Sequence, residues 1–587
     1  MPDFSPRQKT YIASSTEINI FLRACAGAGK TEVIAQKIAN EMQSWELFPA
    51  GMAVLTFSRS ATTELIQRIS QFRKASRFEY PHFIGTIDGF LLKHIVTPLA
   101  HHITGFAGKD GDYSLRILDS EALTFQRTKY AIEHQRISAN KYDWNASECR
   151  FVFEHPSDAI RRKLNSIELA DWQIKDLRET KKRFLSAGYA TYRDVEHLAI
   201  QILSDPKFSQ RVALMVERFP FVMIDECQDL SKEQILIFER LAHLGVRFHL
   251  VGDLDQAIYG FRNCFPDAVA KFIARIGCLE MPLSENYRSG QMIVDLNRKL
   301  IAGPPIQGRT DFSSTTCYLV EYKNSPAEVL ATFDSLARDH RISVIVARGH
   351  ATLNRMRGEI ATPASVQVLA QAIARFGMNA EGALYESLYM FSSYLARDCI
   401  NCDTLGPEAF FRPIMIDSPE RWHQFLAGCL TVFLSQGLDQ QNVTWSRWCN
   451  ALKTSLPALK SVECLDVDSK VTRDRLMEKK HSSPKDLKDA LVSGCQKKLE
   501  MNVRRRYATI HEVKGETHDL TMLVSSSKQG EYSHWKEWIN DPQSEAARLA
   551  YVASSRPRKI LIWAVKDLDR AERKSLMNLG FQPYPSC

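Results

Sequence analysis

The sequence predicts an α/β fold with two parallel sheets, each interrupted by a mainly helical insertion. Short apolar runs alternate with helical patterns over the first hundred residues, and this alternation returns twice further along the chain. It is lost over residues 100–210 and 356–502. Strands that alternate with helices form parallel sheets covered on both faces. A chain of 587 residues is also too long for one core, which favours several domains.

The first predicted sheet takes strands from both sides of residues 100–210. The two apolar runs before this stretch, residues 18–22 and 52–57, each precede a helical pattern, residues 31–42 and 60–72. The later strands are residues 219–224, 247–251 and 278–283. We therefore expect one domain to comprise residues 1–99 and 211–295, with 100–210 as its insertion.

The second predicted sheet is divided in the same way. Its strands are residues 317–322, 342–347, 507–510, 520–524 and 559–565. We expect a domain of residues 296–355 and 503–587 that carries residues 356–502 as its insertion. Residues 470–506 are strongly basic, which fits either contact with a duplex or protein partner or a solvated helical face.

Composition narrows the class of protein without identifying a partner. Hydrophobic residues make up 44% of the chain and charged residues 25%, and the net charge of +8 permits a polyanionic partner but does not demonstrate one. Thirteen cysteines without a disulfide framework favour a reducing compartment. Cys399 and Cys402 have metal-ligand spacing, but no second close pair accompanies them, so two buried thiols on a helix remain the alternative. Without a signal pattern or an apolar span, we expect a cytoplasmic protein that does not enter membranes.

Residues 23–31, Arg-Ala-Cys-Ala-Gly-Ala-Gly-Lys-Thr, form a phosphate-binding pattern between a predicted strand and a helix. In such a loop, backbone N–H groups and the helix N-terminus surround a phosphate. Lys30 would reach the β- and γ-phosphates, and the Thr31 hydroxyl would hold Mg²⁺. A chance match to so short a pattern is not rare. The predicted nucleotide-binding segment consists of Ala24, Cys25, Ala26, Gly27, Ala28, Gly29, Lys30 and Thr31.

Two adjacent carboxylates follow a predicted buried strand. Residues 221–224 are apolar and lead directly into Asp225 and Glu226. Asp225 can bind Mg²⁺ through water, and Glu226 can orient or deprotonate the attacking water. Two surface acids at a strand end would be the alternative, but the phosphate loop in the same chain favours hydrolysis of ATP or GTP.

That reaction also requires groups that act at the γ-phosphate, and the candidates are Gln256, Arg288 and Arg556. Negative charge builds on the γ-phosphate oxygens in the transition state, and guanidinium groups stabilise it. Arginines far apart in sequence and on different domains would make hydrolysis depend on closure of the cleft between them. Either arginine taken singly is equally consistent with an ordinary surface position.

Tyr259, Phe261 and Arg262 follow the Gln256 segment immediately. Aromatic side chains in a groove stack on bases without regard to sequence, so this segment is a candidate for binding a nucleic-acid strand. Alternate aromatics also suit a strand in a core, which is the competing interpretation.

Together these motifs resemble the UvrD/PcrA/Rep-type helicases of superfamily 1A, over both α/β domains. The resemblance implies two RecA-like motor domains of a P-loop NTPase, 1A (1–99 and 211–295) and 2A (296–355 and 503–587), with insertions 1B (100–210) and 2B (356–502). It also implies ATP and Mg²⁺ as cofactors, 3′→5′ translocation on single-stranded DNA, duplex unwinding and association with the nucleoid.

The resemblance extends the predicted site to further residues. Gln8 and Tyr287 would contact adenine, and Glu516 would contact the nucleotide. Arg288 and Arg556 would be the two arginine fingers. Residues that would contact DNA are Thr56, Phe57, Ser58, Arg59, Thr86, Tyr259, Phe261, Arg262 and His511.

Several positions depart from the family pattern. Glu32 stands where Arg is usual after the loop, which puts contacts to the base in doubt. Ile87 and Asp88 replace a common Phe and His, and residues 514–518, Lys-Gly-Glu-Thr-His, shift an acidic residue by one place. The Lys-Gly-Glu-Thr-His variant and the compact length of the chain resemble helicase-like subunits of anti-phage operons such as the Gabija system, and predict a nuclease or other operon-encoded partner. The resemblance leaves DNA repair and anti-phage defence as the two candidate pathways.

Two alternatives stay open. The chain could be a regulatory subunit whose nucleotide or DNA state controls a nuclease, with little unwinding of its own. RNA could replace DNA as substrate, because stacking does not discriminate between the sugars.

Overall fold

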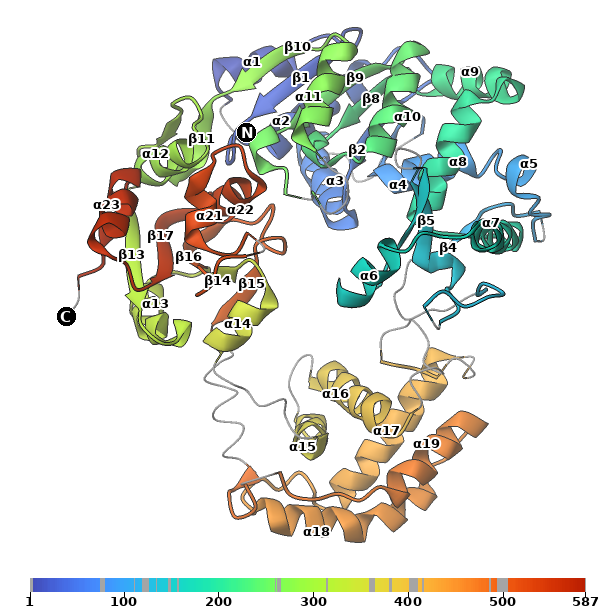
Figure 1. Cartoon of the computed structure of the whole chain (residues 1–587), viewed down its shortest axis with the longest axis vertical. Helices are drawn as coiled ribbons and strands as arrows, with labels where there is room; N and C mark the ends of the chain where they lie inside the picture. Colours follow the sequence, from blue (N-terminus) through green and yellow to red (C-terminus); the bar gives the residue numbers. More distant parts are fainter. Residues whose placement is uncertain are drawn as a thin grey trace. The chain divides into compact units, whose positions relative to one another are not determined.

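The computed structural model forms two compact units (Figure 1). Unit 1 comprises Met1–Leu118, Gln126–Gly358 and Arg505–Cys587, and unit 2 comprises Asp119–Phe125 and Glu359–Arg504. The structure describes residues 4–73, 80–109, 111–118, 126–133, 135–145, 149–155, 158–258, 260, 265–312, 315–357, 365–378, 383–400, 410–413, 416, 418–484, 487–492, 505–530 and 532–585.

Unit 1 contains a six-stranded parallel sheet in the order β10-β1-β9-β8-β2-β3. Its strands are β1 (Ile20–Ala24), β2 (Met52–Thr56), β3 (Phe83–Thr86), β8 (Phe221–Ile224), β9 (Arg247–Gly252) and β10 (Leu279–Leu283). Successive side chains point to opposite faces, so Ile20 and Leu22 pack in one core while Phe21 packs in another.

Helices cover both faces of this sheet, as its nearly continuous apolar strands require. The core on one face is shared with α1 (Pro6–Ile12), α2 (Lys30–Ser44) and α3 (Arg59–Arg73). The core on the other face is shared with α4 (Ile87–Phe90), the π-helix η1 (Leu91–Val96), α8 (Tyr192–Ser204), α9 (Ser209–Arg218), α10 (Lys232–His243) and α11 (Pro266–Arg275).

The chain between β3 and β8 is mostly helical but also contains a hairpin that the sequence did not predict. Strands β5 (Tyr142–Asn145) and β6 (Arg150–Phe153) pair antiparallel and pack with α6 (Asp158–Asn165) and α7 (Asp171–Ser186) in a small core. Short strands β4 (Arg116–Ile117) and β7 (Tyr189–Ala190) pair in parallel.

A second six-stranded parallel sheet in unit 1 has the order β15-β14-β16-β17-β13-β18. Its strands are β13 (Thr316–Tyr322), β14 (Ser343–Ala347), β15 (Arg506–Thr509), β16 (His518–Val524), β17 (Pro557–Lys566) and β18 (Gln582–Pro583). Beside it, β11 (Glu285–Gly290) pairs with β12 (Gln307–Arg309).

Helices again lie on both faces of the second sheet. One core includes α12 (Gln291–Leu300), α21 (Trp535–Asn540), α22 (Glu545–Ser554) and α23 (Arg570–Leu579). The opposite core includes α13 (Leu330–Ala337) and α14 (His350–Met356).

Unit 2 is helical and has a hydrophobic core of its own. Its helices are α15 (Ser365–Phe376), α16 (Ala383–Asp398), α17 (Pro419–Ser435), α18 (Trp445–Ser455) and α19 (Val467–Glu478). Trp422, Trp445 and Trp448 are fully buried in that core. Cys399 is buried there too, whereas Cys402 lies outside the described residues. In the described part of the chain, no group of three or more His, Cys, Asp or Glu side chains could hold a metal ion.

The predicted fold class is confirmed: the chain has two large parallel sheets of the RecA-like α/β type. Each strand predicted from the sequence begins and ends within two residues of its position in the structure. The boundaries of the four predicted segments stay a prediction, since residues 126–210 belong to the same compact unit as both sheets. Among the described helices, none has the length and apolar content needed to cross a membrane.

Candidate nucleotide-binding site

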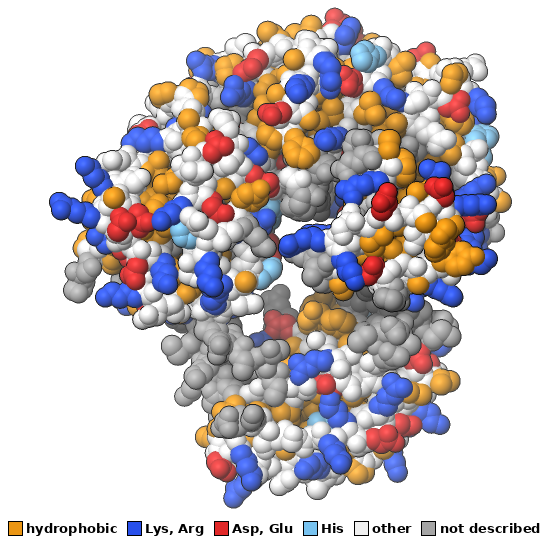
Figure 2. All heavy atoms as spheres, in the orientation of Figure 1, with side chains coloured by type: hydrophobic (Ala, Val, Ile, Leu, Met, Phe, Trp, Pro, Cys, Tyr) orange, Lys and Arg blue, Asp and Glu red, His pale blue; other side chains and the backbone are white. Residues whose placement is uncertain are grey.

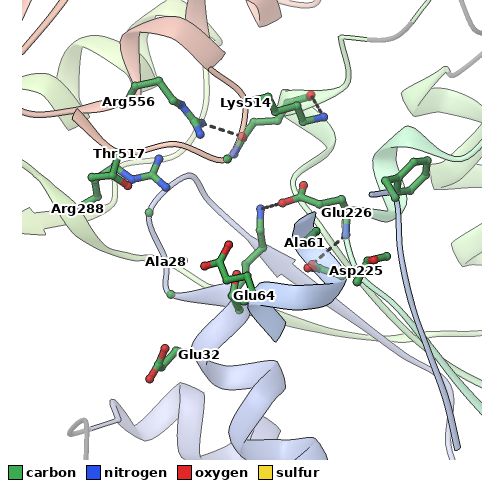
Figure 3. A pocket seen from close by; sticks show the side chains of 18 of the residues that line it. Ala28, Glu32, Ala61, Glu64, Asp225, Glu226, Arg288, Lys514, Thr517 and Arg556 are labelled. Atoms are coloured by element: carbon green, nitrogen blue, oxygen red, sulfur yellow. Dashed lines mark hydrogen bonds and ion pairs between the residues drawn. The ribbon is translucent and has the colours of Figure 1, made fainter. Parts of the chain in front are cut away.

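A cavity of about 610 Å³ in unit 1 lies at the carboxyl ends of β1, β2 and β8 (Figure 3). In open parallel sheets this edge is where ligands bind. The wall opposite the first sheet comes from segments next to the second sheet. The lining residues from that wall are Tyr287, Arg288, Arg309, His511, Lys514, Gly515, Thr517, Arg556 and Arg558.

The phosphate-binding pattern forms the turn between β1 and α2. Gly27 and Gly29 have φ values of 74° and 75°, a region that favours glycine because it has no Cβ. Helix α2 begins at Lys30, so its N-terminal N–H groups face the cavity region that a phosphate would occupy. Residues 27–31 line the cavity, whereas Ala24, Cys25 and Ala26 are buried beneath it.

The predicted acidic pair stands directly after β8. Asp225 is 7% exposed, and the Lys30 Nζ lies 3.5 Å from the Glu226 Oε1. Burial and the neighbouring Glu226 raise the pKa of Asp225; Lys30 and Lys514 overcome burial and lower the pKa of Glu226. Glu226 has φ 54°, an uncommon backbone conformation for a residue with a side chain and one that concentrates at functional sites.

Arg556 and Arg288 bring positive charge into the cavity from the second-sheet side. Arg556 is 2% exposed, and its Nη2 donates to the Gln256 Oε1 at 3.0 Å. The Arg288 Nη1 donates to the Ser555 carbonyl at 3.1 Å. Burial and the nearby Arg556 lower the pKa of Arg288 to about 9, and burial lowers the pKa of Arg556. Two desolvated guanidinium groups close together favour a polyanionic ligand, which would compensate their charge.

Further bonds connect the two sides of the cavity. Lys514 forms an ion pair with Asp229, and its Nζ donates to the Gln256 carbonyl at 3.3 Å. The Gln256 Nε2 donates to the Asp253 Oδ2 at 2.7 Å, and the Tyr551 hydroxyl donates to the same oxygen at 3.2 Å. Gln256 is therefore bonded to groups on both sides of the cavity.

The structure brings many of the other predicted residues to this cavity, but not all of them. Thr56, Phe57, Ser58, Tyr287 and His511, four of them predicted to contact DNA, line it together with the phosphate loop. The other predicted DNA- and nucleotide-contacting residues that the structure describes and that are not among its lining residues are Gln8, Arg59, Thr86 and Glu516.

These four side chains have other contacts or positions. The Gln8 Nε2 donates to the Ala28 carbonyl at 3.1 Å, and Gln8 lines a shallow pocket that shares Ala28 and Tyr287 with the cavity. Glu516 pairs with Arg506 and His518 at 2.6 and 2.9 Å instead. The Thr86 hydroxyl caps α4 by accepting from the Gly89 N–H. Arg59 begins α3.

Tyr259, Phe261 and Arg262 lie outside the described residues. The predicted stacking segment therefore stays a prediction.

Sequence reasoning missed part of the lining. Arg68, Arg309 and Arg558 have no local pattern that marks them, since each reaches the cavity through tertiary packing. Glu32 follows the phosphate loop directly and Glu64 stands on α3, but neither was assigned to the site. The remaining unassigned lining residues are Ala61, Asp229, Lys514, Gly515 and Thr517.

Residues 4–276 match the family described as the UvrD/REP helicase N-terminal domain. This segment belongs to that family. The predicted resemblance to the UvrD-like superfamily 1A is thereby confirmed. The matched residues include the phosphate loop, the acidic pair and Gln256, so the family segment supplies the first-sheet side of the cavity.

The UvrD-like chain is similar to three bacterial proteins named as DNA helicases. It is 26% identical to DNA helicase II of Escherichia coli over 309 residues, which is 51% of this chain and 40% of the relative. It is 25% identical to the ATP-dependent DNA helicase PcrA of Leuconostoc citreum over 301 residues, 49% of this chain and 37% of the relative. It is 25% identical to the ATP-dependent DNA helicase Rep of Escherichia coli over 297 residues, which is 48% of this chain and 41% of the relative. The matches thus span well under half the length of these relatives.

The donor set of the cavity fits a magnesium ion bound together with a nucleotide. Thr31 and Asp225 both line it and offer oxygen ligands. Mg²⁺ in nucleotide sites is held by one or two protein oxygens, phosphate oxygens and water, so a dedicated cluster of protein ligands is not required.

Proposed function

We propose that the chain hydrolyses ATP with Mg²⁺ to move 3′→5′ along single-stranded DNA and to unwind duplex DNA. The observation that carries this proposal is the single cavity in which a phosphate loop and acidic pair meet two buried arginines from the second-sheet side. The relatives' names support DNA as the substrate. The 3′→5′ polarity rests on the resemblance alone.

Each side chain has a role that its position supports. Lys30 and the N-terminus of α2 bind the phosphates, and Thr31 and Asp225 hold Mg²⁺, which would neutralise charge on the phosphate oxygens. Glu226, kept ionised by Lys30 and Lys514, accepts a proton from the attacking water. Gln256 orients groups at the γ-phosphate.

Arg288 and Arg556 stabilise the charge that develops on the γ-phosphate oxygens. Both are anchored to the second-sheet side, Arg556 through its bond from Nε to the Val552 carbonyl at 2.8 Å and Arg288 through Ser555. Hydrolysis breaks the bond between the β- and γ-phosphates, and release of the γ-phosphate as inorganic phosphate then takes away the charge that these arginines contact. Loss of these contacts lets the two sides of the cavity separate after each turnover. Repeated closing and opening would then move a bound strand stepwise.

The binding surface for DNA is less defined than the nucleotide site. On the face shown in Figure 2, the described Lys and Arg side chains are spread among acidic and apolar ones and do not gather in one patch. The net charge of +8 therefore supports a nucleic-acid partner without locating it.

A strand-displacement assay tests this function. Partial duplexes with a 3′ or a 5′ single-stranded tail are mixed with the chain, ATP and Mg²⁺, and Lys30→Ala serves as the inactive control. The proposal predicts displacement from the 3′-tailed duplex only. Displacement from the 5′-tailed duplex alone would refute the polarity.

Nucleotide hydrolysis without displacement of either duplex would instead favour the regulatory alternative, in which the chain controls a nuclease partner. The assignment to anti-phage defence rests on the variant pattern of residues 514–518 and stays a prediction, as does the alternative role in DNA repair.

A further inference from the structure

The turn that carries Gln256 is held from the second-sheet side along most of its length. The turn consists of Asp253, the 3₁₀ helix η5 (Leu254–Gln256), Ala257 and Ile258. Its partners, in addition to Tyr551, Lys514 and Arg556, are the Arg548 Nε, which donates to the Ala257 carbonyl at 2.8 Å, and the His511 ring, whose Nε2 lies 3.2 Å from the Ile258 carbonyl oxygen. The position of the Gln256 side chain therefore depends on how the second-sheet side docks on this turn.

One further contact to the turn has no part in the site described so far. Arg298, on α12, places its Nη1 3.8 Å from the Asp255 Oδ2. Arg298 is 8% exposed, and neither member of this ion pair is among the described residues that line the cavity. The pair therefore acts on the turn from outside the cavity.

The Arg298 guanidinium is held in one place by its own surroundings. Its Nε donates to the Pro304 carbonyl at 2.8 Å. Gly303 packs directly against it, since a Cβ at position 303 would lie 1.8 Å from the Arg298 Nη2 and 2.2 Å from its Cζ. A side chain that is already ordered loses less entropy when it pairs with a carboxylate.

Asp255 needs a cation beside it because a second carboxylate stands two residues earlier in the turn. The Asp253 Oδ1 accepts from the Asp255 N–H at 3.2 Å, and its Oδ2 accepts from the Gln256 Nε2 at 2.7 Å. Burial and the neighbouring Asp253 raise the pKa of Asp255, and Arg298 opposes that shift. Without Arg298, repulsion between the two carboxylates would act on the group that holds the Gln256 amide.

We propose that Arg298 is a positioning residue for hydrolysis, which acts through Asp255 to hold Gln256 at the γ-phosphate. This inference rests on the proposed nucleotide function and deepens it. Because the ion pair does not line the cavity, its loss should change the rate of turnover and leave the affinity for ATP as it is.

Steady-state ATP hydrolysis by the full chain, with Mg²⁺ and single-stranded DNA, tests this role. Arg298→Met removes the charge, and Lys299→Met, at the next and exposed position of α12, is its control. We expect Arg298→Met to lower kcat by about tenfold to 100-fold, the cost of a misplaced group, with KM for ATP unchanged. In a Gln256→Ala background the same substitution should lower kcat no further, because residues that act as a unit are not additive.

Gly303→Ala tests the same contact without removing either partner. The added methyl would take the place of the Arg298 guanidinium, so this variant should also lower kcat and leave KM for ATP unchanged. Gly349→Ala is the matched control, because Gly349 has an extended backbone and a Cβ there meets nothing within 4 Å. Gly349→Ala should turn over ATP at the unmodified rate.

Hydrogen exchange followed by mass spectrometry separates this inference from the proposed motor. In Arg298→Met, the amides of residues 254–258 should exchange faster while those of the two sheets stay protected. Unchanged exchange at these residues would overturn the inference, as would a loss of kcat that adds fully to that of Gln256→Ala. Absence of ATP hydrolysis by the unmodified chain would refute the proposed motor, and faster exchange at residues 254–258 would then still support the contact of Arg298 with the turn.

Discussion

Replacing Gly27 by alanine tests how closely the phosphate loop packs against the arginine-bearing segment. A Cβ at position 27 would lie 2.8 Å from the Arg288 Cβ and 2.7 Å from the Asn286 Oδ1. The Arg288 Cβ is fixed to the backbone and cannot swing away. The Gly27 carbonyl also accepts from the Tyr287 N–H at 2.8 Å, so the two segments are held together.

Two costs add in this variant. Adopting φ 74° costs an alanine about 1–2 kcal/mol, and overpacking adds about 1–3 kcal/mol. Gly277→Ala is the matched control, because Gly277 has φ 66° and a Cβ there meets nothing within 4 Å. If the loop shifts to relieve the clash, binding must restore its geometry, so ATP affinity should fall by about five- to 150-fold.

The assay is calorimetric titration with a non-hydrolysable ATP analogue, accompanied by thermal unfolding of each variant. Gly277→Ala should bind as tightly as the unmodified chain while showing the conformational cost alone. Equal affinity of Gly27→Ala and Gly277→Ala would refute the close packing of loop and arginine segment.

Two further predictions follow from other buried groups. Arg556→Ala should lower turnover by about 10³- to 10⁵-fold in steady-state kinetics while sparing ATP binding in titration. Arg573→Ala, at an exposed position, is the control. Loss of ATP affinity with unchanged turnover would make Arg556 only a binding residue. Burial and Lys37 lower the pKa of His249 to about 3, so the folded state keeps this histidine neutral and loses stability as pH falls below the unfolded pKa of about 6.5 toward 3. Between pH 7 and 5 the free energy of unfolding should fall by about 2 kcal/mol through this histidine. In urea unfolding, His249→Gln should lose correspondingly less stability over the same pH range. Identical pH profiles of the variant and the unmodified chain would contradict the lowered pKa of His249.

The sequence predicted the long apolar strands well, because strands buried on both faces have a strong and local signal. Strand β3 (Phe83–Thr86) carries less of that signal, since it is short, partly exposed and interrupted by Gly85. The hairpin at Tyr142–Asn145 was missed because its apolar side chains complete a small local core that becomes visible only with α7 in place. Tertiary packing, rather than propensity, determines such elements.

For the site, the predictable residues were those whose chemistry coincides with a local motif. Asp225 and Glu226 directly follow one predicted strand, and Lys30 ends the turn that follows another, so the topology alone brings them together. Arg68 reaches the cavity from the third turn of α3, and no spacing rule relates it to the phosphate loop. Glu516 was assigned to the nucleotide from a shifted motif, and in the structure it pairs with Arg506 and His518, so its contact with the nucleotide stays a prediction.

Steady-state ATP hydrolysis with and without single-stranded DNA, with Lys30→Ala measured alongside, tests the central claim most directly. We expect DNA to stimulate turnover strongly and Lys30→Ala to abolish it without unfolding the chain. Hydrolysis by Lys30→Ala at the unmodified rate would contradict the assignment of this cavity as the catalytic site.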